Sequence, residues 1–226
     1  MADISHNLET IQGQIAAATS KSGRPADCVQ LLAVSKTYPP GIIQQAYAAG
    51  QIHFGENRVQ ELLEKVPALP QDINWHLIGH LQKNKVRKVL AGLATIHSVD
   101  SLAIAQSISR IAGELGLKIS IYLQVNISQD DAKFGFADEE MPAALEQVQA
   151  MPHLQVEGLM TIPQFTSDLE KTRHHFSALR DLRDQLAQSS GLPLPGLSMG
   201  MSHDFTVAIE EGATIVRVGS AIFGQR

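Results

Sequence analysis

The sequence predicts one α/β domain, a closed TIM-type (β/α)8 barrel over residues 1–226. Short apolar runs rich in β-branched residues alternate with longer segments of helical periodicity, which predicts parallel strands joined by helices. Eight such strand and helix units are the number that closes a parallel sheet into a barrel. Because no tract rich in Gly, Ser or Pro divides the chain, we expect a single domain.

An extra helix is expected before the first strand. Ile4, Leu8, Ile11 and Ile15 recur at helical spacing and place one apolar stripe on this segment. Only AIFGQR follows the loop after the last predicted strand, so we expect the usual closing helix of the barrel to be missing. We therefore expect the N-terminal helix to take over part of its covering role.

Eight runs combine apolar, β-prone residues with a polar or small residue at the end. They are LLAVSK from 31, IHFGEN from 52, WHLIGH from 75, TIHSVD from 95, ISIYLQVN from 119, VEGLMT from 156, LSMGMS from 197 and TIVRVG from 214. Segments of helical periodicity, such as 102–115 and 176–186, lie between them. The main alternative is an open doubly wound sheet. Its nucleotide-binding forms are not supported, because no G-x-G-x-x-G follows the first strand and no Gly-rich loop ends in Lys-Ser or Lys-Thr.

The composition favours a small-molecule partner. A net charge of −5 with 18% charged residues indicates no basic surface for nucleic acid or anionic membranes. Cys28 is the only cysteine, which excludes an internal disulfide and a cysteine-rich metal site. The N-terminus has no basic start followed by an apolar run, so we expect no signal peptide and a cytoplasmic protein. No two histidines and a carboxylate have metal-ligand spacing, so we expect no metal.

The active site of such a barrel lies at the carboxyl ends of the strands. The residues expected there are Lys36, Asn57, His80, Ser98, Asn126, Thr161, Ser202 and Gly219. Lys36 directly follows an apolar strand, so its stem should lie in the barrel mouth, and an unprotonated lysine amine can attack an aldehyde. Position alone leaves a second interpretation open, a solvent-facing charge at the end of a strand.

The last two strand ends supply features of a phosphate site. Residues 200–202 and 218–220 combine glycines, hydroxyls and free backbone N–H groups, and these two loops bind phosphate in many such barrels. Ordinary turn residues remain the alternative. Arg217 lies inside the last apolar strand, where a permanent charge needs a partner, so it is either part of a structural ion pair or a ligand contact.

At these residues the sequence resembles the pyridoxal-phosphate homeostasis proteins, which are relatives of the alanine racemase N-terminal barrel. The matching stretches are AVSKTYP, HFGENRVQE, WHLIGHLQKNK, IHSVDS, QVNIS, GLMTI, LSMGMSHD and VRVGSAIFG. They are spread over residues 31–224, so the resemblance covers nearly the whole chain.

The resemblance implies that Lys36 carries pyridoxal 5′-phosphate (PLP) as a Schiff base. The other implied ligands are Ser202, Gly219 and Ser220 for the phosphate, and Arg217, Asn57, Met160 and Ser198 for the ring. In this assignment Arg217 faces the pyridine nitrogen. An arginine there would keep that nitrogen unprotonated and weaken the ring as an electron sink.

The function implied by the resemblance is homeostasis of intracellular PLP (vitamin B6) and of amino acids, without turnover of a substrate. The alternatives are a PLP-dependent amino-acid racemase or other small PLP enzyme, and, more remotely, a Schiff-base aldolase without cofactor. We expect a monomer that binds PLP and makes transient contact with PLP-dependent enzymes. Racemase activity is not expected, because Tyr38, Tyr47 and Tyr122 offer no second acid or base opposite Lys36.

Two further residues near the predicted mouth have open roles. His80 is expected either near the cofactor or as a filler of the mouth, and Lys133 as a surface or mouth residue. The basic run LQKNKVRK lacks interleaved aromatic residues, which favours a solvated helix start over a nucleic-acid site. His174 and His175 lie in a polar helical stretch and are expected on the surface.

Overall fold

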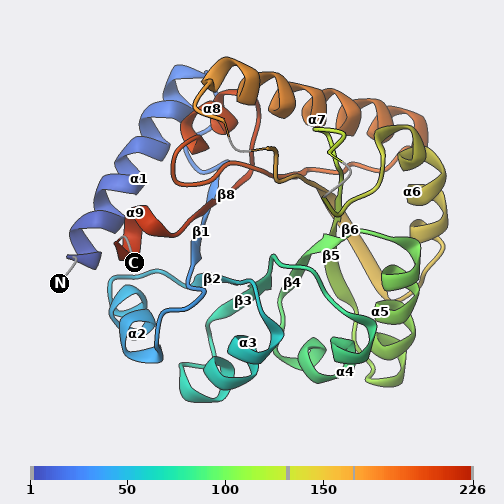
Figure 1. Cartoon of the computed structure of the whole chain (residues 1–226), viewed down its shortest axis with the longest axis horizontal. Coiled ribbons are helices and arrows are strands. Elements are labelled where there is room, and N and C mark those ends of the chain that lie inside the picture. The colour runs from blue at the N-terminus through green and yellow to red at the C-terminus, as the bar shows by residue number, and fades with distance from the viewer. Residues whose placement is uncertain (1–2, 131–132, 165, 225–226) are drawn as a thin grey trace.

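The computed structural model describes residues 3–130, 133–164 and 166–224. Its eight strands are all parallel and close into a barrel in sequence order, as predicted (Figure 1). They are β1 (Gln30–Val34), β2 (His53–Glu56), β3 (Asn74–Leu77), β4 (Thr95–Val99), β5 (Ile119–Gln124), β6 (Leu154–Met160), β7 (Gly196–Ser198) and β8 (Ile215–Val218). The barrel closes between β8 and β1, where Arg217 pairs with Leu32 and Val218 with Ala33.

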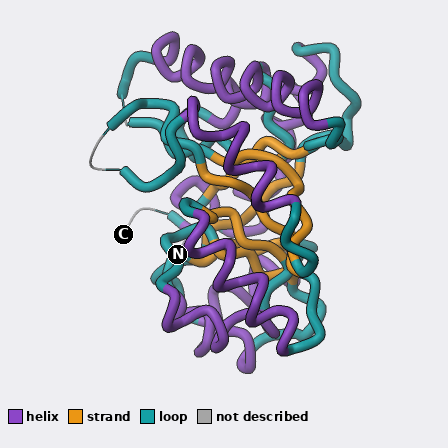
Figure 2. Tube along the Cα trace, turned by 90° about the vertical axis from the view of Figure 1, so that its right-hand side faces the viewer, coloured by secondary structure: helices purple, strands orange, loops and turns teal. Residues whose placement is uncertain are grey.

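Helices surround the strands on the outside of the barrel (Figure 2). The α-helices are α1 (Ile4–Lys21), α2 (Pro40–Ala48), α3 (Val59–Lys65), α4 (Val86–Val89), α5 (Leu102–Glu114), α6 (Met141–Gln149), α7 (Leu169–Ser190), α8 (Phe205–Glu210) and α9 (Ser220–Phe223). Single 3₁₀ turns lie at Val66–Ala68, Lys83–Lys85, Leu90–Gly92 and Asp138–Glu140. Among the helices of the described residues, none is long and apolar enough to cross a membrane.

The N-terminal helix has the covering role expected from its apolar stripe. Asp3 caps its first turn by accepting a hydrogen bond of 3.1 Å from the His6 backbone N–H. The buried face of α1 packs against α8, α9 and α2 (Figure 1). After β8 the described residues, which end at 224, form the single turn α9, and Asn7 on α1 donates a hydrogen bond of 2.8 Å to the carbonyl of Ile222 in that turn. The first helix therefore packs over the turn that follows β8.

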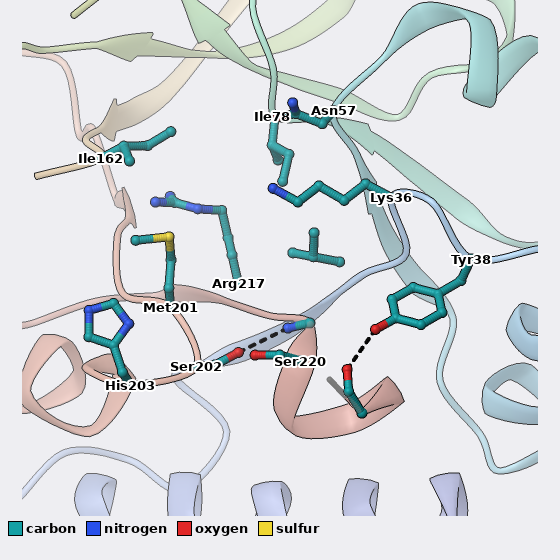
Figure 3. Close-up of a pocket in the computed structure, with 13 residues that line it drawn as sticks. Lys36, Tyr38, Asn57, Ile78, Ile162, Met201, Ser202, His203, Arg217 and Ser220 are labelled. Atoms are coloured by element: carbon teal, nitrogen blue, oxygen red, sulfur yellow. Dashed lines mark hydrogen bonds between the residues drawn. The ribbon is translucent and has the colours of Figure 1, made fainter. Parts of the chain in front are cut away.

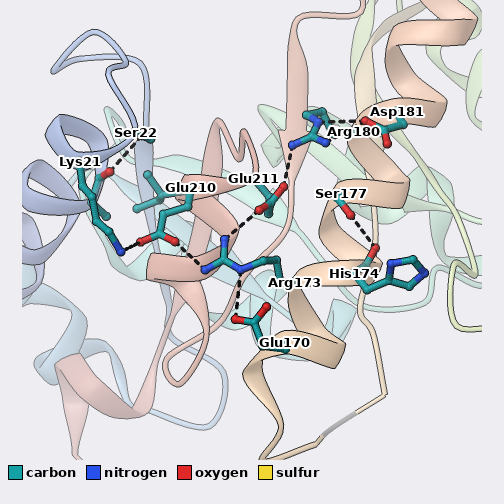
Figure 4. A network of polar contacts seen from close by, with 12 residues as sticks. Lys21, Ser22, Glu170, Arg173, His174, Ser177, Arg180, Asp181, Glu210 and Glu211 are labelled. Atoms are coloured by element: carbon teal, nitrogen blue, oxygen red, sulfur yellow. Dashed lines mark hydrogen bonds and ion pairs between the residues drawn. The ribbon is translucent and has the colours of Figure 1, made fainter.

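A network of ion pairs fastens the short helix α8 to its neighbours (Figure 4). On α7, Arg173 pairs with Glu210 at 2.6 Å and with Glu211 at 2.8 Å. Lys21, at the end of α1, also pairs with Glu210, and Arg180 pairs with Glu211. Because α8 directly follows the loop after β7, these contacts hold the base of that loop between the first and the seventh helices.

Candidate functional site

A cavity of about 510 Å³ opens at the carboxyl ends of the strands, where the site was predicted. Its volume falls within the range of about 300–1,000 Å³ that is typical of small-ligand pockets. The described lining residues are Val34, Lys36, Tyr38, Asn57, Ile78, Ile162, Met201, Ser202, His203, Arg217, Gly219, Ser220 and Gly224. No aspartate or glutamate occurs in this part of the lining, while Lys36 and Arg217 do, so the pocket favours an anionic ligand.

Lys36 follows β1 and extends into the pocket (Figure 3). Its two chain neighbours are both held by α3. The carboxylate of Glu61 accepts a hydrogen bond of 2.5 Å from the Thr37 backbone N–H, and the Lys65 amine donates one of 3.0 Å to the Ser35 carbonyl. Thr37 has a φ of 69°, in the left-handed region that non-glycine residues rarely adopt. The contacts from α3 therefore hold a strained turn that directs Lys36 into the cavity.

A buried ion pair lies behind the lysine loop. The amine of Lys65 is 2.8 Å from Oε1 of Glu56, and the two side chains are 5% and 0% exposed. Ser35 donates a hydrogen bond of 2.6 Å to the same oxygen, while the buried Oε2 has no hydrogen-bond partner. Burial raises the pKa of the Glu56 carboxyl, and its bonds to Lys65 and Ser35 oppose that rise. Neither charge is among the residues that line the pocket, so this pair supports the loop from outside it.

The loops after β7 and β8 meet at one end of the pocket (Figure 3). The backbone N–H of Gly219 donates a hydrogen bond of 3.2 Å to Oγ of Ser202, and Ser220 follows at the start of α9. A Cβ atom at position 219 would lie 3.1 Å from the carbonyl oxygen of Val34, so glycine allows β8 to continue close to β1. Hydroxyl and backbone donors from the two loops thus lie at the same end of the cavity, and the Gly219 N–H, expected to be free, is bonded to Ser202.

Arg217 is only 3% exposed, and its guanidinium is held by neutral acceptors. It donates hydrogen bonds to the Ser198 carbonyl at 2.7 Å, to Ser198 Oγ at 2.8 Å and to the Thr161 carbonyl at 2.8 Å. The ion pairs found in the described part of the chain do not include Arg217, which does line the pocket. Burial lowers the pKa of Arg217 to about 10, and the charge of Asp204 opposes this shift. The guanidinium therefore remains protonated at neutral pH.

Six of the eight expected ligand residues line the cavity, and two do not. Met160 is fully buried in a small apolar cluster inside the barrel. Ser198 is also fully buried and reaches the cavity only through its hydrogen bonds to Arg217. Asn57 does line the cavity, and a Cβ at Gly79 would lie 2.1 Å from its carbonyl oxygen, so the loop after β3 requires glycine there. The two exceptions lie one layer below the pocket surface.

His80 and Lys133 both lie outside the described lining. His80 is hydrogen-bonded to Asp100 at 2.6 Å and stacks on Phe134 with ring centroids 4.1 Å apart, and its side chain is exposed. Lys133 donates a hydrogen bond of 3.2 Å to the carbonyl of Ile162, which lines the pocket, so it lies near the mouth. Burial lowers the pKa of Lys133.

The sequence prediction missed several lining residues. Val34 lies two positions before Lys36, so its side chain points to the same face of the extended chain. This alternation is a sequence signal that could have identified it. Tyr38 lines the pocket and donates a hydrogen bond of 2.7 Å to the carbonyl of Gly224, a contact between distant segments that no local pattern indicates. The same holds for Ile162 and His203, which the loops after β6 and β7 bring to the cavity.

Comparisons with known proteins place the chain among relatives of similar length. The alanine racemase N-terminal domain family matches residues 3–226. A pyridoxal phosphate homeostasis protein of Aquifex aeolicus is 42% identical over 97% of this chain and 96% of its own length. The solved structure of PipY from Synechococcus elongatus with PLP bound is 42% identical, with a TM-score of 0.87, and the match covers 98% of this chain and all of PipY.

An alanine racemase of Clostridium difficile shares the fold at a TM-score of 0.78 but only 15% identity, and the match covers 57% of the racemase. Full-length identity above 40% with the homeostasis proteins is far higher than this. The chain therefore belongs to the pyridoxal phosphate homeostasis protein family, within the larger alanine racemase N-terminal domain family.

Proposed function

We propose that this protein binds PLP in the cavity, with Lys36 as the Schiff-base lysine, and serves the homeostasis of PLP and amino acids. The observation that carries the proposal is the convergence in one pocket of a lysine that follows β1, anion donors from the loops after β7 and β8, and a buried arginine within β8. The names of the homeostasis relatives and the PLP in the PipY structure support it.

The residues of the cavity suit the parts of this cofactor. PLP supplies an aldehyde and an electron-withdrawing ring, and the protein must bind and orient both. Lys36 offers the amine for the aldehyde, and Ser202, Ser220 and the Gly219 loop offer donors for the phosphate. Apolar side chains such as Ile78 provide walls for a ring. The cavity therefore offers contacts for both the aldehyde and the phosphate of PLP.

Arg217 is the donor that we assign to the pyridine nitrogen. A guanidinium can donate hydrogen bonds but cannot accept them, so it would hold that nitrogen as an acceptor without a proton. An unprotonated ring withdraws electrons less strongly, which disfavours carbanion chemistry. This supports a role in holding the cofactor rather than in turning over an amino acid.

The positions of the tyrosines support the same conclusion. Two-sided proton transfer, which a racemase needs, requires a second acid or base opposite the lysine. Tyr47 lies on the outer helix α2 and is bonded to Asp72, and Tyr122 lies inside the barrel, stacked on His97. Tyr38 does reach the pocket, but its hydroxyl donates to the Gly224 carbonyl.

The proposal is tested by loading the purified protein with PLP, reducing it with borohydride and locating the pyridoxyl adduct by peptide mass spectrometry. We expect a yellow protein that bleaches on reduction, with the adduct on Lys36. Lys36→Ala should remain folded and colourless, because the side chain extends into a cavity rather than into the core. An adduct on Lys133 in the wild-type protein would refute the assignment of Lys36.

A further inference from the structure

Three histidines form a chain of hydrogen bonds through the interior of the barrel. Nδ1 of His53 lies 3.2 Å from Nε2 of His76, and Nδ1 of His76 lies 2.9 Å from Nε2 of His97. Nδ1 of His97 lies 2.8 Å from Oγ of Ser198, which accepts a hydrogen bond of 2.8 Å from Arg217. The chain thus joins the first residue of β2, at the amino end of the barrel, to the guanidinium in the pocket at the carboxyl end.

The two inner histidines are buried, with His76 only 4% exposed and His97 fully buried. Barrel interiors are filled mainly by branched apolar side chains, because a buried polar group is costly unless it is hydrogen-bonded. Burial lowers the pKa of His76 to about 3, with a smaller contribution from His53. Burial, His76 and Arg217 also lower the pKa of His97. Both rings are therefore neutral near pH 7, and each carries one donor and one acceptor nitrogen.

Arg217 sets the direction of this chain. Its guanidinium only donates, so Ser198 Oγ is an acceptor toward Arg217 and has its hydroxyl hydrogen available for Nδ1 of His97. With Nδ1 as the acceptor, His97 carries its proton on Nε2 and donates to Nδ1 of His76, and His76 donates in the same way to His53. The reverse direction would leave the Ser198 hydroxyl hydrogen without an acceptor among the contacts of that side chain.

We propose that His97 is a positioning residue for Arg217, acting through Ser198, and that His76 helps to hold His97 as the Nε2–H tautomer. With the hydroxyl hydrogen of Ser198 bound to His97, the oxygen lone pairs face the guanidinium. Together with the carbonyls of Ser198 and Thr161, they hold the guanidinium in one orientation. The inference rests on the proposed function, because it concerns how Arg217 meets the cofactor ring.

The tautomers are tested first, without cofactor, by ¹⁵N-edited NMR of the imidazole nitrogens of the wild-type protein. We expect His97 and His76 both to carry their proton on Nε2 at pH 7. A proton on Nδ1 of His97 would overturn the proposal, whether or not the protein binds PLP.

The positioning role is tested by measuring the affinity for PLP and for an analogue with carbon in place of the ring nitrogen. His97→Phe should weaken PLP binding about tenfold, which corresponds to one hydrogen bond to a charged group, and should leave the affinity for the analogue within about twofold. His97→Asn keeps an acceptor near the position of Nδ1 and should restore most of the PLP affinity. Tyr122→Phe is the matched control, because this ring stacks on His97 inside the same barrel but makes none of these hydrogen bonds.

The outcomes separate the two proposals. Equal losses for PLP and the analogue in His97→Phe, with no recovery in His97→Asn, would show that the histidine only supports the fold. If His97→Phe does not fold, His97→Asn carries the test. A folded His97→Asn variant that has lost the wild-type preference for PLP over the analogue would refute the positioning role. If the wild type carries the expected tautomers but does not bind PLP at all, the proposed function fails while the hydrogen-bond chain stands.

Discussion

Replacing Lys65 by methionine tests the buried support of the lysine loop. The side chain is 5% exposed and donates to the Ser35 carbonyl, to Glu56 and to Glu61. Methionine preserves the apolar volume but leaves the buried carboxylate of Glu56 without its cation. Breaking a buried pair from one side costs about 3–5 kcal/mol of unfolding free energy. At about 2–4 °C per kcal/mol for a chain of this size, the melting temperature should fall by about 6–20 °C.

The loss should depend on pH in a defined direction. Burial already raises the pKa of Glu56 above its usual 4.5, and removing Lys65 removes the contributions that lower it. A carboxyl whose pKa is raised in the folded state costs no stability below its unfolded pKa. The cost grows as the pH rises from the unfolded pKa to the folded pKa and is constant above it. The deficit of Lys65→Met should therefore be largest at pH 8 and shrink as the pH approaches 4.5.

The assay is urea denaturation of wild type, Lys65→Met and the double variant Lys65→Met with Glu56→Gln, at several pH values. The double variant carries no uncompensated charge at position 56 and should recover much of the loss at pH 8. Lys88→Met, an exposed lysine on α4, is the matched control and should stay within about 0.5 kcal/mol of wild type. A pH-independent loss, or no recovery in the double variant, would refute the role assigned to the buried pair.

Two further predictions concern the pocket itself. Replacing Ser202 and Ser220 together by alanine should weaken binding of PLP by about 1.5–3 kcal/mol for each lost charged hydrogen bond and spare pyridoxal, which lacks the phosphate. Isothermal titration with both ligands checks this, and equal losses would mean that the serines only support the fold. The PLP-loaded protein, incubated with L-alanine in deuterated water, should show no multiple-turnover formation of D-alanine. Sustained turnover that disappears in Lys36→Ala would contradict the non-enzymatic role.

The barrel was predictable because each of its units carries a local signal. Short apolar strand segments alternate eight times with segments of helical periodicity, and no nucleotide-binding motif supports the open-sheet alternative. The position of Lys36 followed from the same pattern, since the residue after an apolar parallel strand reaches the carboxyl edge. The structure confirms the closed order of the strands and brings Lys36, Ser202 and Gly219 to one cavity.

Depth within the barrel was not predictable in the same way. Met160 and Ser198 are the last residues of β6 and β7, whereas Lys36 lies two residues beyond the end of β1. Both are fully buried and do not line the cavity. The pairing of Glu56 with Lys65 was also not predictable from the sequence. The pattern of a short helix does not distinguish a solvent-exposed lysine from one that packs against the barrel. Such contacts depend on three-dimensional register, which a strand pattern does not specify.

The closure of the barrel between β1 and β8 has a consequence for folding. Leu32 on β1 pairs with Arg217 on β8, so the two strands that close the barrel are separated by most of the chain. Contacts between residues so far apart in sequence form slowly because closing the loop between them costs entropy. Lys36 follows one side of the seam and Gly219 the other. A folding intermediate that lacks the seam therefore has half a pocket, and the appearance of cofactor affinity during refolding should be a late kinetic event that reports completion of the ring of strands.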